Sequence, residues 1–221
     1  MPTEHFNILG TSEATLSYIF ESIAACSYKN ATVTIIKNID YTPKLPFAIE
    51  GLAHEIVADK DIDFSNIKNC LIGVHRCVVK KQVFDYFKKN HGVTSNKYTN
   101  IISPNSVIYS TSTLGVGINI SDHVVLSAYS HIENFVTISK GTIIGHHTHV
   151  GDFCTMNQGV QIAGNCRIGE GTLFGMGAHI VDGITIGKNS VIGACSLVTK
   201  DIPEGVVAYG IPAKIIRPAI S

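Results

Sequence analysis

Histidine is the residue type with the clearest chemical potential in this chain. Ten histidines occur in 221 residues, and His146, His147 and His149 stand almost side by side. An imidazole changes its charge near neutral pH and is the usual side chain for taking a proton from a nucleophile. One of these three rings is therefore the first candidate for a general base, provided that regular structure holds it beside a bound substrate.

A six-residue repeat surrounds these histidines. From Ile102 to Val198 a sizeable apolar residue, here called an anchor, recurs at every sixth position, seventeen times without an insertion. This period fits neither an amphipathic helix nor an alternating strand, but it fits a solenoid in which each unit supplies one flat side. With three sides to a coil, the repeat predicts a parallel β-helix of between five and six coils. The anchors are Ile102, Ile108, Leu114, Ile120, Leu126, Ile132, Ile138, Ile144, Val150, Met156, Ile162, Ile168, Phe174, Ile180, Ile186, Ile192 and Val198.

The residues that follow an anchor also repeat. Glycine often comes directly after it, as at Gly145 and Gly169, and we expect these glycines at turns that need backbone freedom. The fourth residue after an anchor is usually small or β-branched, as at Thr148. In a coil of eighteen residues, His146 falls at a corner, and its equivalents one coil away are Ala128 and Gly164. Both are small, which leaves space on either side of the ring.

Residues 1–99 lack the repeat and alternate between strand-like and helix-like segments, which predicts a small parallel β-α-β unit. Residues 100–221 are assigned to the solenoid, and its last part, from Asp201 onward, is expected to cap the final coil. The expected strands are Phe6–Leu9, Ala31–Ile36 and Cys70–Val74, and the expected helices contain Leu16–Ala24 and Val79–Lys89. In the second helix Val79, Val83 and Phe87 form the buried stripe, and Lys80, Lys81, Lys88 and Lys89 are expected outside.

Composition excludes several classes of protein. Seventeen basic and seventeen acidic residues balance, and only 15% of the chain is charged, which argues against a nucleic-acid or anionic-membrane surface. The low charge and a mean hydropathy of +0.23 suggest an outer surface partly buried by self-association. We find no apolar run of membrane-spanning length and no signal-peptide pattern, so we expect a cytoplasmic protein. The six cysteines form no C-x-x-C and are interpreted as small core residues in a reducing compartment.

Three motifs point to a known family: a Gly10 loop after the first strand, the string from Ile143 to His147 followed by Gly151-Asp152-Phe153, and the tail Tyr209–Lys214. With the repeat, they make the whole chain resemble the hexapeptide-repeat acyltransferases, in the group of sialic-acid O-acetyltransferases and bacillosamine-pathway sugar N-acetyltransferases. The resemblance implies a left-handed parallel β-helix behind a small Rossmann-like domain. It also implies an acetyl-CoA-dependent N-acetyltransferase for a nucleotide-linked amino sugar, such as a UDP-linked 4-amino-4,6-dideoxy sugar, in surface glycan synthesis. A sialic-acid-type sugar O-acetyltransferase and a non-catalytic β-helix scaffold are the alternatives.

The same resemblance implies roles for single residues. His146 matches the catalytic base, and Gly164 matches a glycine whose N–H contacts the thioester carbonyl and so donates to the oxyanion. Ala194 matches a further backbone contact to coenzyme A, and Lys214 and Arg217 lie in the tail that approaches its phosphates. In the relatives a glutamate after the catalytic histidine orients it; His147 replaces that glutamate here, so Asp152 or a backbone carbonyl is expected to orient His146. A second histidine of the family is replaced by Thr155.

The resemblance also assigns the acceptor and the assembly. Gly10, Ser12, Asn38 and His147 are expected to contact the nucleotide-linked sugar. The first loop has one glycine and carries Glu13, so we expect nucleotide binding without a strong grip on the pyrophosphate; Ser12 would otherwise act only as a helix N-cap. A homotrimer is expected, because the family builds its acyl-donor cleft between neighbouring β-helices.

A metal site was also considered. His131 and His149 are eighteen residues apart and stack on adjacent coils in outward-facing positions, as a metal pair or as a surface ladder. The γ-class carbonic anhydrases bind zinc on this kind of helix through an H-x4-H spacing and a third histidine two coils earlier. The histidines here do not reproduce that set, so we expect no metal.

Overall fold

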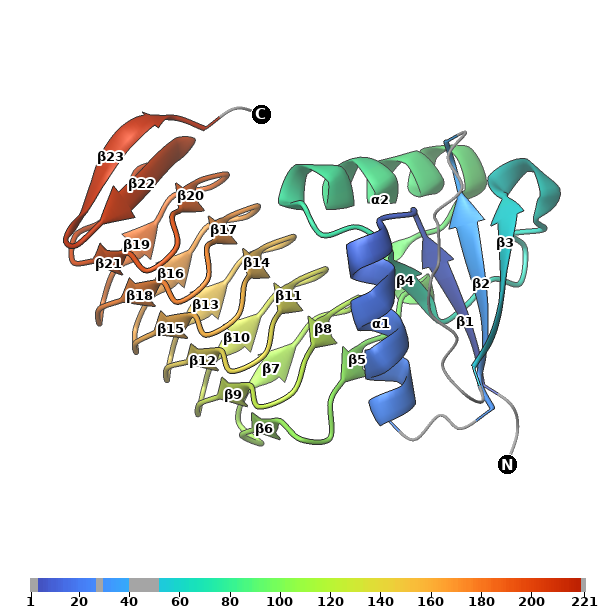
Figure 1. The fold of residues 1–221 in the computed structure, drawn as a ribbon, viewed down its shortest axis with the longest axis horizontal. Coiled ribbons are helices and arrows are strands. Elements are labelled where there is room, and N and C mark those ends of the chain that lie inside the picture. Colours follow the sequence, from blue (N-terminus) through green and yellow to red (C-terminus); the bar gives the residue numbers. More distant parts are fainter. Residues whose placement is uncertain (1–3, 27–29, 40–51, 220–221) are drawn as a thin grey trace.

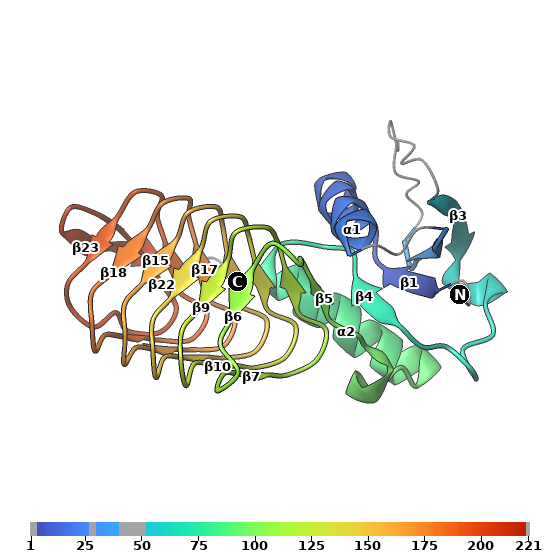
Figure 2. The same cartoon turned by 90° about the horizontal axis from the view of Figure 1, so that it is seen from below.

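The computed structural model describes residues 4–26, 30–39 and 52–219. A small parallel sheet with two helices comes first, and a solenoid of stacked coils follows from Ile101 (Figures 1 and 2). No helix in these ranges is long and apolar enough to cross a bilayer. The small parallel sheet and the solenoid that the sequence predicted are both present.

The N-terminal sheet has the order β3-β2-β1-β4, with all neighbours parallel. Its elements are β1 (His5–Leu9), α1 (Glu13–Ala25), β2 (Thr32–Lys37), β3 (Ala53–Ala58), β4 (Cys70–Ile72) and α2 (Cys77–His91), with single turns of 3₁₀-helix at Asp59–Asp61 and Ser95–Lys97. The apolar side of α1 packs with Phe6, Ile8 and Val33 on one side of the sheet, and α2 packs with Leu9 and Ile36 on the other. The predicted β-α-β unit is confirmed. The strand β3 was not predicted. This edge strand has no buried residue, so its sequence lacks the alternation of apolar and polar residues by which a half-buried strand is recognised.

Helix α2 ends at a glycine cap: Gly92 is in the left-handed region (φ 68°), and its N–H donates to the Lys88 carbonyl. The helix differs from its prediction at one residue, Lys80. This residue is only 2% exposed, and its Nζ donates to the carbonyls of Phe135 and Cys154, each at 2.9 Å. Burial lowers the pKa of Lys80 to about 8. The expectation that Lys80 faces solvent was wrong, because the solenoid covers this side of the helix.

The solenoid consists of seventeen two-residue strands, and each ends on an anchor. They are β5 (Ile101–Ile102), β6 (Val107–Ile108), β7 (Thr113–Leu114), β8 (Asn119–Ile120), β9 (Val125–Leu126), β10 (His131–Ile132), β11 (Thr137–Ile138), β12 (Ile143–Ile144), β13 (His149–Val150), β14 (Thr155–Met156), β15 (Gln161–Ile162), β16 (Arg167–Ile168), β17 (Leu173–Phe174), β18 (His179–Ile180), β19 (Thr185–Ile186), β20 (Val191–Ile192) and β21 (Leu197–Val198). Strands eighteen residues apart pair in parallel, as His131 pairs with His149. The predicted period and register are confirmed.

Three sheets run along the solenoid, and we number them by the strand that opens each. The first face starts at β5, the second at β6 and the third at β7. The chain turns from first to second face at the first corner, from second to third at the second corner, and from third back to first at the third corner. Helix α2 lies along the first face and the third corner, where Phe84 packs against Phe135 and Phe153.

The interior of the solenoid is built from the anchors. From Ile120 to Val198 every anchor is buried, which contributes on the order of 1.5–3 kcal/mol for each large aliphatic side chain. Ile102, Ile108 and Leu114 are partly buried, because they lie at the open first coil. The small residues four places after the anchors fill the inner corners, and their hydroxyls bond across coils, as Thr148 Oγ1 does to the Ala163 carbonyl at 2.9 Å.

The glycines after the anchors have a different cause from the one we expected. A Cβ on Gly145 would lie 2.4 Å from the Ala163 carbonyl carbon, and a Cβ on Gly169 would lie 2.6 Å from the Lys188 nitrogen. Glycine is needed there because adjacent coils approach closely, so the expectation of backbone freedom was wrong. Positive φ occurs instead three places after the anchor, at residues such as His147 (φ 56°) and Gly159 (φ 70°).

The C-terminal segment closes the last coil. β22 (Val206–Gly210) pairs with β20 and extends the first face, and β23 (Ala213–Pro218) returns antiparallel to it. Ile202 is buried and bridges to Ile186 on the third face. The expected cap after Asp201 is thus a β-hairpin joined to the stack; residues 220–221 lie outside the described part of the chain.

Candidate active site

The second corner places His146 against a glycine of the next coil. A Cβ built on Gly164 would lie 2.6 Å from His146 Cε1 and 2.7 Å from His146 Nε2. The ring therefore occupies the space that a side chain at position 164 would take. His146 is exposed and Gly164 is buried, so the imidazole lies over the Gly164 backbone with its other side open to solvent. Of the expected site residues, these two are brought together directly.

His147 is the neighbour that contacts the His146 ring. The two Nδ1 atoms lie 3.1 Å apart, so one nitrogen donates and the other accepts, according to the tautomers. When His146 donates from Nδ1, its Nε2 keeps a lone pair and can accept a proton. His147 is itself held by a backbone bond to the Ala128 carbonyl, and its ring centroid lies 5.0 Å from that of Tyr129. His147 thus takes the place of the glutamate that the resemblance led us to look for.

A carboxylate that sequence reasoning missed lies one coil further along. Asp182 Oδ1 would be 3.0 Å from a Cβ on Gly164, and it accepts a hydrogen bond from Asn165 Nδ2 at 3.1 Å. Asp182 is exposed at the same corner. The signal was available, because Ala128, His146, Gly164 and Asp182 follow each other at intervals of eighteen residues. The corner therefore combines a base, a backbone glycine and a negative charge.

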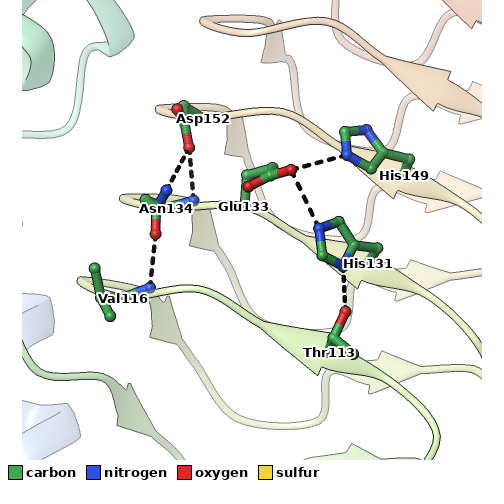
Figure 3. A network of polar contacts seen from close by, with 7 residues as sticks. All are labelled: Thr113, Val116, His131, Glu133, Asn134, His149 and Asp152. Atoms are coloured by element: carbon green, nitrogen blue, oxygen red, sulfur yellow. Dashed lines mark hydrogen bonds and ion pairs between the residues drawn. The ribbon is translucent and has the colours of Figure 1, made fainter.

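Asp152 does not have the role that we expected. It lies at the third corner, where Oδ1 accepts from the Asn134 backbone N–H at 2.8 Å and from Asn134 Nδ2 at 3.0 Å (Figure 3). A difference of six residues moves a side chain to the next corner of the coil, whereas a difference of eighteen stacks it. The prediction that Asp152 orients His146 is therefore wrong within one chain. Asp152 instead links two neighbouring coils at the third corner.

The residues expected to hold coenzyme A lie apart from His146 in one chain. Ala194 is exposed at the first corner, across the second face from His146. Lys214 and Arg217 are exposed on β23, where Arg217 Nη1 donates to the Pro218 carbonyl at 3.0 Å. Of the residues expected to hold coenzyme A, Gly164 alone lies beside His146 within one chain, and the roles of Ala194, Lys214 and Arg217 stay predictions.

The expected nucleotide-contacting residues gather at the carboxyl end of the N-terminal sheet. Gly10 follows β1 and Asn38 follows β2. The Gly10 N–H donates to the Ile36 carbonyl at 3.1 Å, and the Ser12 N–H donates to the Gly73 carbonyl at 2.9 Å. Ser12 stands at the N-cap of α1 but makes no side-chain cap bond. Two N–H groups of this loop are thus already bonded within the protein.

A cavity missed by the sequence analysis lies beside this edge, between α1 and the first face. His75, which follows β4, lines it together with Tyr18 and Asn119. His75 Nε2 lies 2.8 Å from Asn157 Oδ1, and burial lowers the pKa of His75, so its ring is neutral at pH 7. Among the described residues, the buried Thr15 Oγ1 and Asn119 Oδ1, which line the same cavity, have no hydrogen-bond partner. The cavity offers polar atoms to a small polar group.

Comparison with known proteins supports the fold and indicates relatives. Residues 165–200 match the family model of the bacterial transferase hexapeptide, six repeats. A histidine-to-asparagine variant of perosamine N-acetyltransferase from Caulobacter crescentus, solved with CoA and GDP-perosamine, is 25% identical, with 98% of each chain covered and a TM-score of 0.80. The acetyltransferase domain of PglB from Neisseria gonorrhoeae, with acetyl coenzyme A, is 20% identical, with 97% of this chain and 100% of that chain covered and a TM-score of 0.81. WeeI from Acinetobacter baumannii is 21% identical, with the same coverage and a TM-score of 0.76. No curated protein matches.

These likenesses define the class of the protein. The chain is a hexapeptide-repeat protein with the fold of sugar N-acetyltransferases, a left-handed β-helix behind a small parallel sheet. The resemblance inferred from the sequence is confirmed, and the perosamine N-acetyltransferase, the PglB domain and WeeI each match over almost the whole chain.

Proposed function

We propose that this protein transfers the acetyl group of acetyl-coenzyme A to the amine of a nucleotide-linked amino sugar, for surface glycan synthesis. The observation that carries the proposal is the His146 imidazole lying over the buried backbone of Gly164 at the second corner. Support comes from the perosamine N-acetyltransferase, which has the same two-part fold over 98% of both chains and was solved with CoA and GDP-perosamine.

In the proposed reaction His146 Nε2 takes a proton from the neutral amine as the new C–N bond forms. The tetrahedral intermediate then collapses with cleavage of the C–S bond, and the His146 imidazolium returns the proton to the sulfur, so that coenzyme A leaves as the thiol. The Nδ1 contact with His147 holds the ring and leaves Nε2 beside Gly164, without a hydrogen bond to any residue that the structure describes. The Gly164 N–H, which has no backbone acceptor among the residues described, donates to the oxygen that becomes negative when the thioester carbonyl is attacked. The exposed Asp182 attracts the positively charged ammonium form to the corner, where it loses one proton to solvent before the neutral amine attacks.

We place the acceptor nucleotide in the N-terminal domain, residues 1–99. Gly10 and Asn38 lie at the carboxyl end of its parallel sheet, the edge at which such sheets bind ligands. The Gly10 and Ser12 N–H groups are occupied by Ile36 and Gly73, which supports nucleotide binding without a strong pyrophosphate grip. The sugar then points along the cavity at His75 toward the first corner.

We propose a homotrimer, because one chain does not bring the acceptor cavity and the base together. The second face lies between His146 and the corner of Asn157 and Ala194. That face carries exposed apolar side chains: Val107 is 56% and Ile143 is 39% exposed. Closed packing of second faces and their corners between copies would set the cavity of one chain beside His146 of the next. Ala194, Lys214 and Arg217 would then line the coenzyme A cleft of a neighbouring copy.

The trimer is tested by light scattering at micromolar concentration. The wild-type protein should have three times the mass of one chain, and Ile143→Glu should lower this mass, because it places charges on the packed face. His179→Ala, which alters an exposed position on the same face without adding charge, is the matched control. A monomeric wild-type protein that still turns over substrate contradicts the proposal.

We also propose a cytoplasmic location. All six cysteines are free, and Cys70, Cys77, Cys154 and Cys166 are buried, as expected for a chain that folds under reducing conditions. Burial raises the pKa of Cys154 to about 12, so that this thiol is unreactive.

The function is tested by thiol release from acetyl-coenzyme A over a panel of acceptors: GDP- and UDP-linked amino sugars, the same nucleotides linked to sugars with a hydroxyl in place of the amine, and free sialic acid. We expect turnover with the nucleotide-linked amino sugars and with none of the other acceptors in the panel. Turnover with a hydroxyl acceptor would instead make the protein an O-acetyltransferase, and no thiol release with any acceptor would favour the non-catalytic scaffold.

A further inference from the structure

A second group of histidines lies on the third face, apart from the candidate active site. His131 on β10 and His149 on β13 stack with ring centroids 5.0 Å apart and an interplanar angle of 17°. Glu133, just after β10, places Oε1 at 3.1 Å from His131 Nε2 and at 3.1 Å from His149 Nε2 (Figure 3). One carboxylate oxygen and two imidazole nitrogens therefore converge at a single point.

The spacing of these atoms fits a metal ion. All three ligand atoms lie within 4.8 Å of one another. For metal–ligand bonds of about 2.1 Å, two ligand atoms are about 3.4 Å apart around a tetrahedral ion and about 3.0 Å apart around an octahedral ion. The two N···O distances of 3.1 Å fall between these values. Two imidazoles and a carboxylate are also a ligand set that suits zinc and related divalent ions.

We propose that His131, Glu133 and His149 bind one divalent transition-metal ion of the zinc type. Water completes the coordination, because the three side chains are 46%, 37% and 42% exposed. This revises our expectation of no metal, which compared the sequence with one known histidine pattern and did not consider a carboxylate ligand. None of the three residues belongs to the proposed acetyl-transfer machinery, so the ion is a separate site and the inference is independent of the proposed function.

The surroundings hold the ligands in place. The Thr113 hydroxyl on β7 bonds to His131 Nδ1, which orients the ring with Nε2 toward Glu133. The strands that carry the two histidines are fixed by ladder bonds, from His131 N–H to the Thr148 carbonyl and from His149 N–H to the Cys166 carbonyl, both at 2.9 Å. When an ion enters, the two Nε2 atoms bind it through their lone pairs, so the proton that each of them donates to Glu133 moves to Nδ1 or is released to solvent.

Charges of both signs surround the three ligands. Arg167 lies beside His149 on the neighbouring strand and Lys188 lines the same surface, so two positive charges repel a bound cation. Asp152 and Glu170 line the same surface and offset them. Without an ion, the contacts of Glu133 with His131 and His149 are partly exposed to solvent and contribute little to stability.

The test is a titration of the metal-free full-length protein with Zn²⁺ against a chromophoric chelator, repeated with Co²⁺ to record the visible spectrum of the bound ion. We expect one ion per chain. His149→Gln and Glu133→Gln should each weaken binding by at least about tenfold to a hundredfold, since even the loss of an outer contact costs roughly that much. Thr113→Val, which keeps all three ligands, should cost about tenfold by the same reasoning.

His179→Ala is the matched control, because His179 is exposed and also directly precedes an anchor, but it has no carboxylate beside it in this set. It should bind Zn²⁺ like the wild type. The proposal is overturned when wild-type protein binds no stoichiometric Zn²⁺, or when His149→Gln and Glu133→Gln bind as tightly as His179→Ala. Circular dichroism of each variant separates loss of ligand from loss of fold.

Discussion

The two groups of histidines come within three residues of each other at His146 and His149 but have different surroundings. At the second corner, His146 contacts His147 and the bare backbone of Gly164. On the third face, His131 and His149 share the carboxylate of Glu133. The histidine pairs are similar in type and exposure, so the difference comes from which residues the eighteen-residue stacking places beside them.

This difference separates two kinds of chemistry. An imidazole held by a neutral partner keeps a nitrogen free to take up and release a proton, as a general base must. Two imidazoles that donate to one carboxylate have their nitrogens directed at a single point beside a negative charge, and a metal ion can replace the two shared protons there. The comparison therefore predicts that changes at the corner alter turnover and that changes on the face alter metal binding and stability.

The largest effect is expected for His146→Ala. Because general base catalysis typically contributes about 10²–10⁴-fold, kcat should fall by about two orders of magnitude or more, whereas coenzyme A binding should change little. Steady-state thiol release and calorimetric titration with coenzyme A measure the two quantities. His147→Ala should cost less, because it removes a positioning contact and leaves the base. Retention of most of kcat by His146→Ala would place the base elsewhere.

A smaller effect is expected for Gly164→Ala. The added Cβ would lie 2.6 Å from His146 Cε1, so the ring must swing away, and a misplaced base should lower kcat by about tenfold or more. Stability should be nearly unchanged, because the ring is exposed. Gly145→Ala is the contrasting variant: its Cβ would meet the Ala163 backbone at 2.4 Å, which should lower the free energy of unfolding by about 1–3 kcal/mol. Equal loss of stability in both variants would show that Gly164 is only a packing glycine.

His147→Glu makes the corner resemble the face, because it puts a carboxylate beside His146. A negative neighbour favours the protonated imidazole, so the acid limb of the kcat/KM profile should move to higher pH, by about one unit. The profile is measured by thiol release between pH 5 and 9. His147→Gln, which adds no charge, should leave the limb in place; an unchanged profile in both variants would mean that His146 is not the titrating group.

The smallest effect is expected for Glu133→Gln in metal-free buffer. The pKa of Glu133 is lowered by its hydrogen bonds to His149 and His131, so its stabilising contribution is present above its unfolded pKa of about 4.3 and is lost as the pH falls through the lower folded value. The side chain is 37% exposed and screened by solvent, so the variant should lose at most about 1 kcal/mol at pH 6. Urea unfolding should show a difference from wild type that shrinks as the pH is lowered below the unfolded pKa. A difference that does not shrink with falling pH would have another cause.

The fold was predictable wherever the sequence repeats. Every anchor ends a strand in the solenoid, because one apolar residue per side is enough to fix which residues point inward. Outside the repeat the sequence was less informative. The stripe on α2 predicted its sheet-facing side but not the burial of Lys80, since nothing local indicates that a second surface covers the helix.

The candidate site was predictable in part. The pairing of His146 with Gly164 follows from their separation of eighteen residues, and the same count would have found Asp182. Asp152 was misplaced because nearness in sequence was taken for nearness in space. Glu133 was missed because no carboxylate was considered as a partner of the two stacked histidines, although it lies two residues after His131. His75 was missed because its contact with Asn157 joins the two domains, which no interval of the repeat predicts.

The central claim is that the corner histidine performs the chemistry and the face histidines do not. It is tested most directly by thiol release from acetyl-coenzyme A with a nucleotide-linked amino sugar, measured in parallel for wild type, His146→Asn and His149→Gln in chelator-treated buffer. We predict a fall in kcat of about two orders of magnitude or more for His146→Asn and near wild-type turnover for His149→Gln. Near wild-type turnover by His146→Asn, or an equal loss in both variants, would contradict this account.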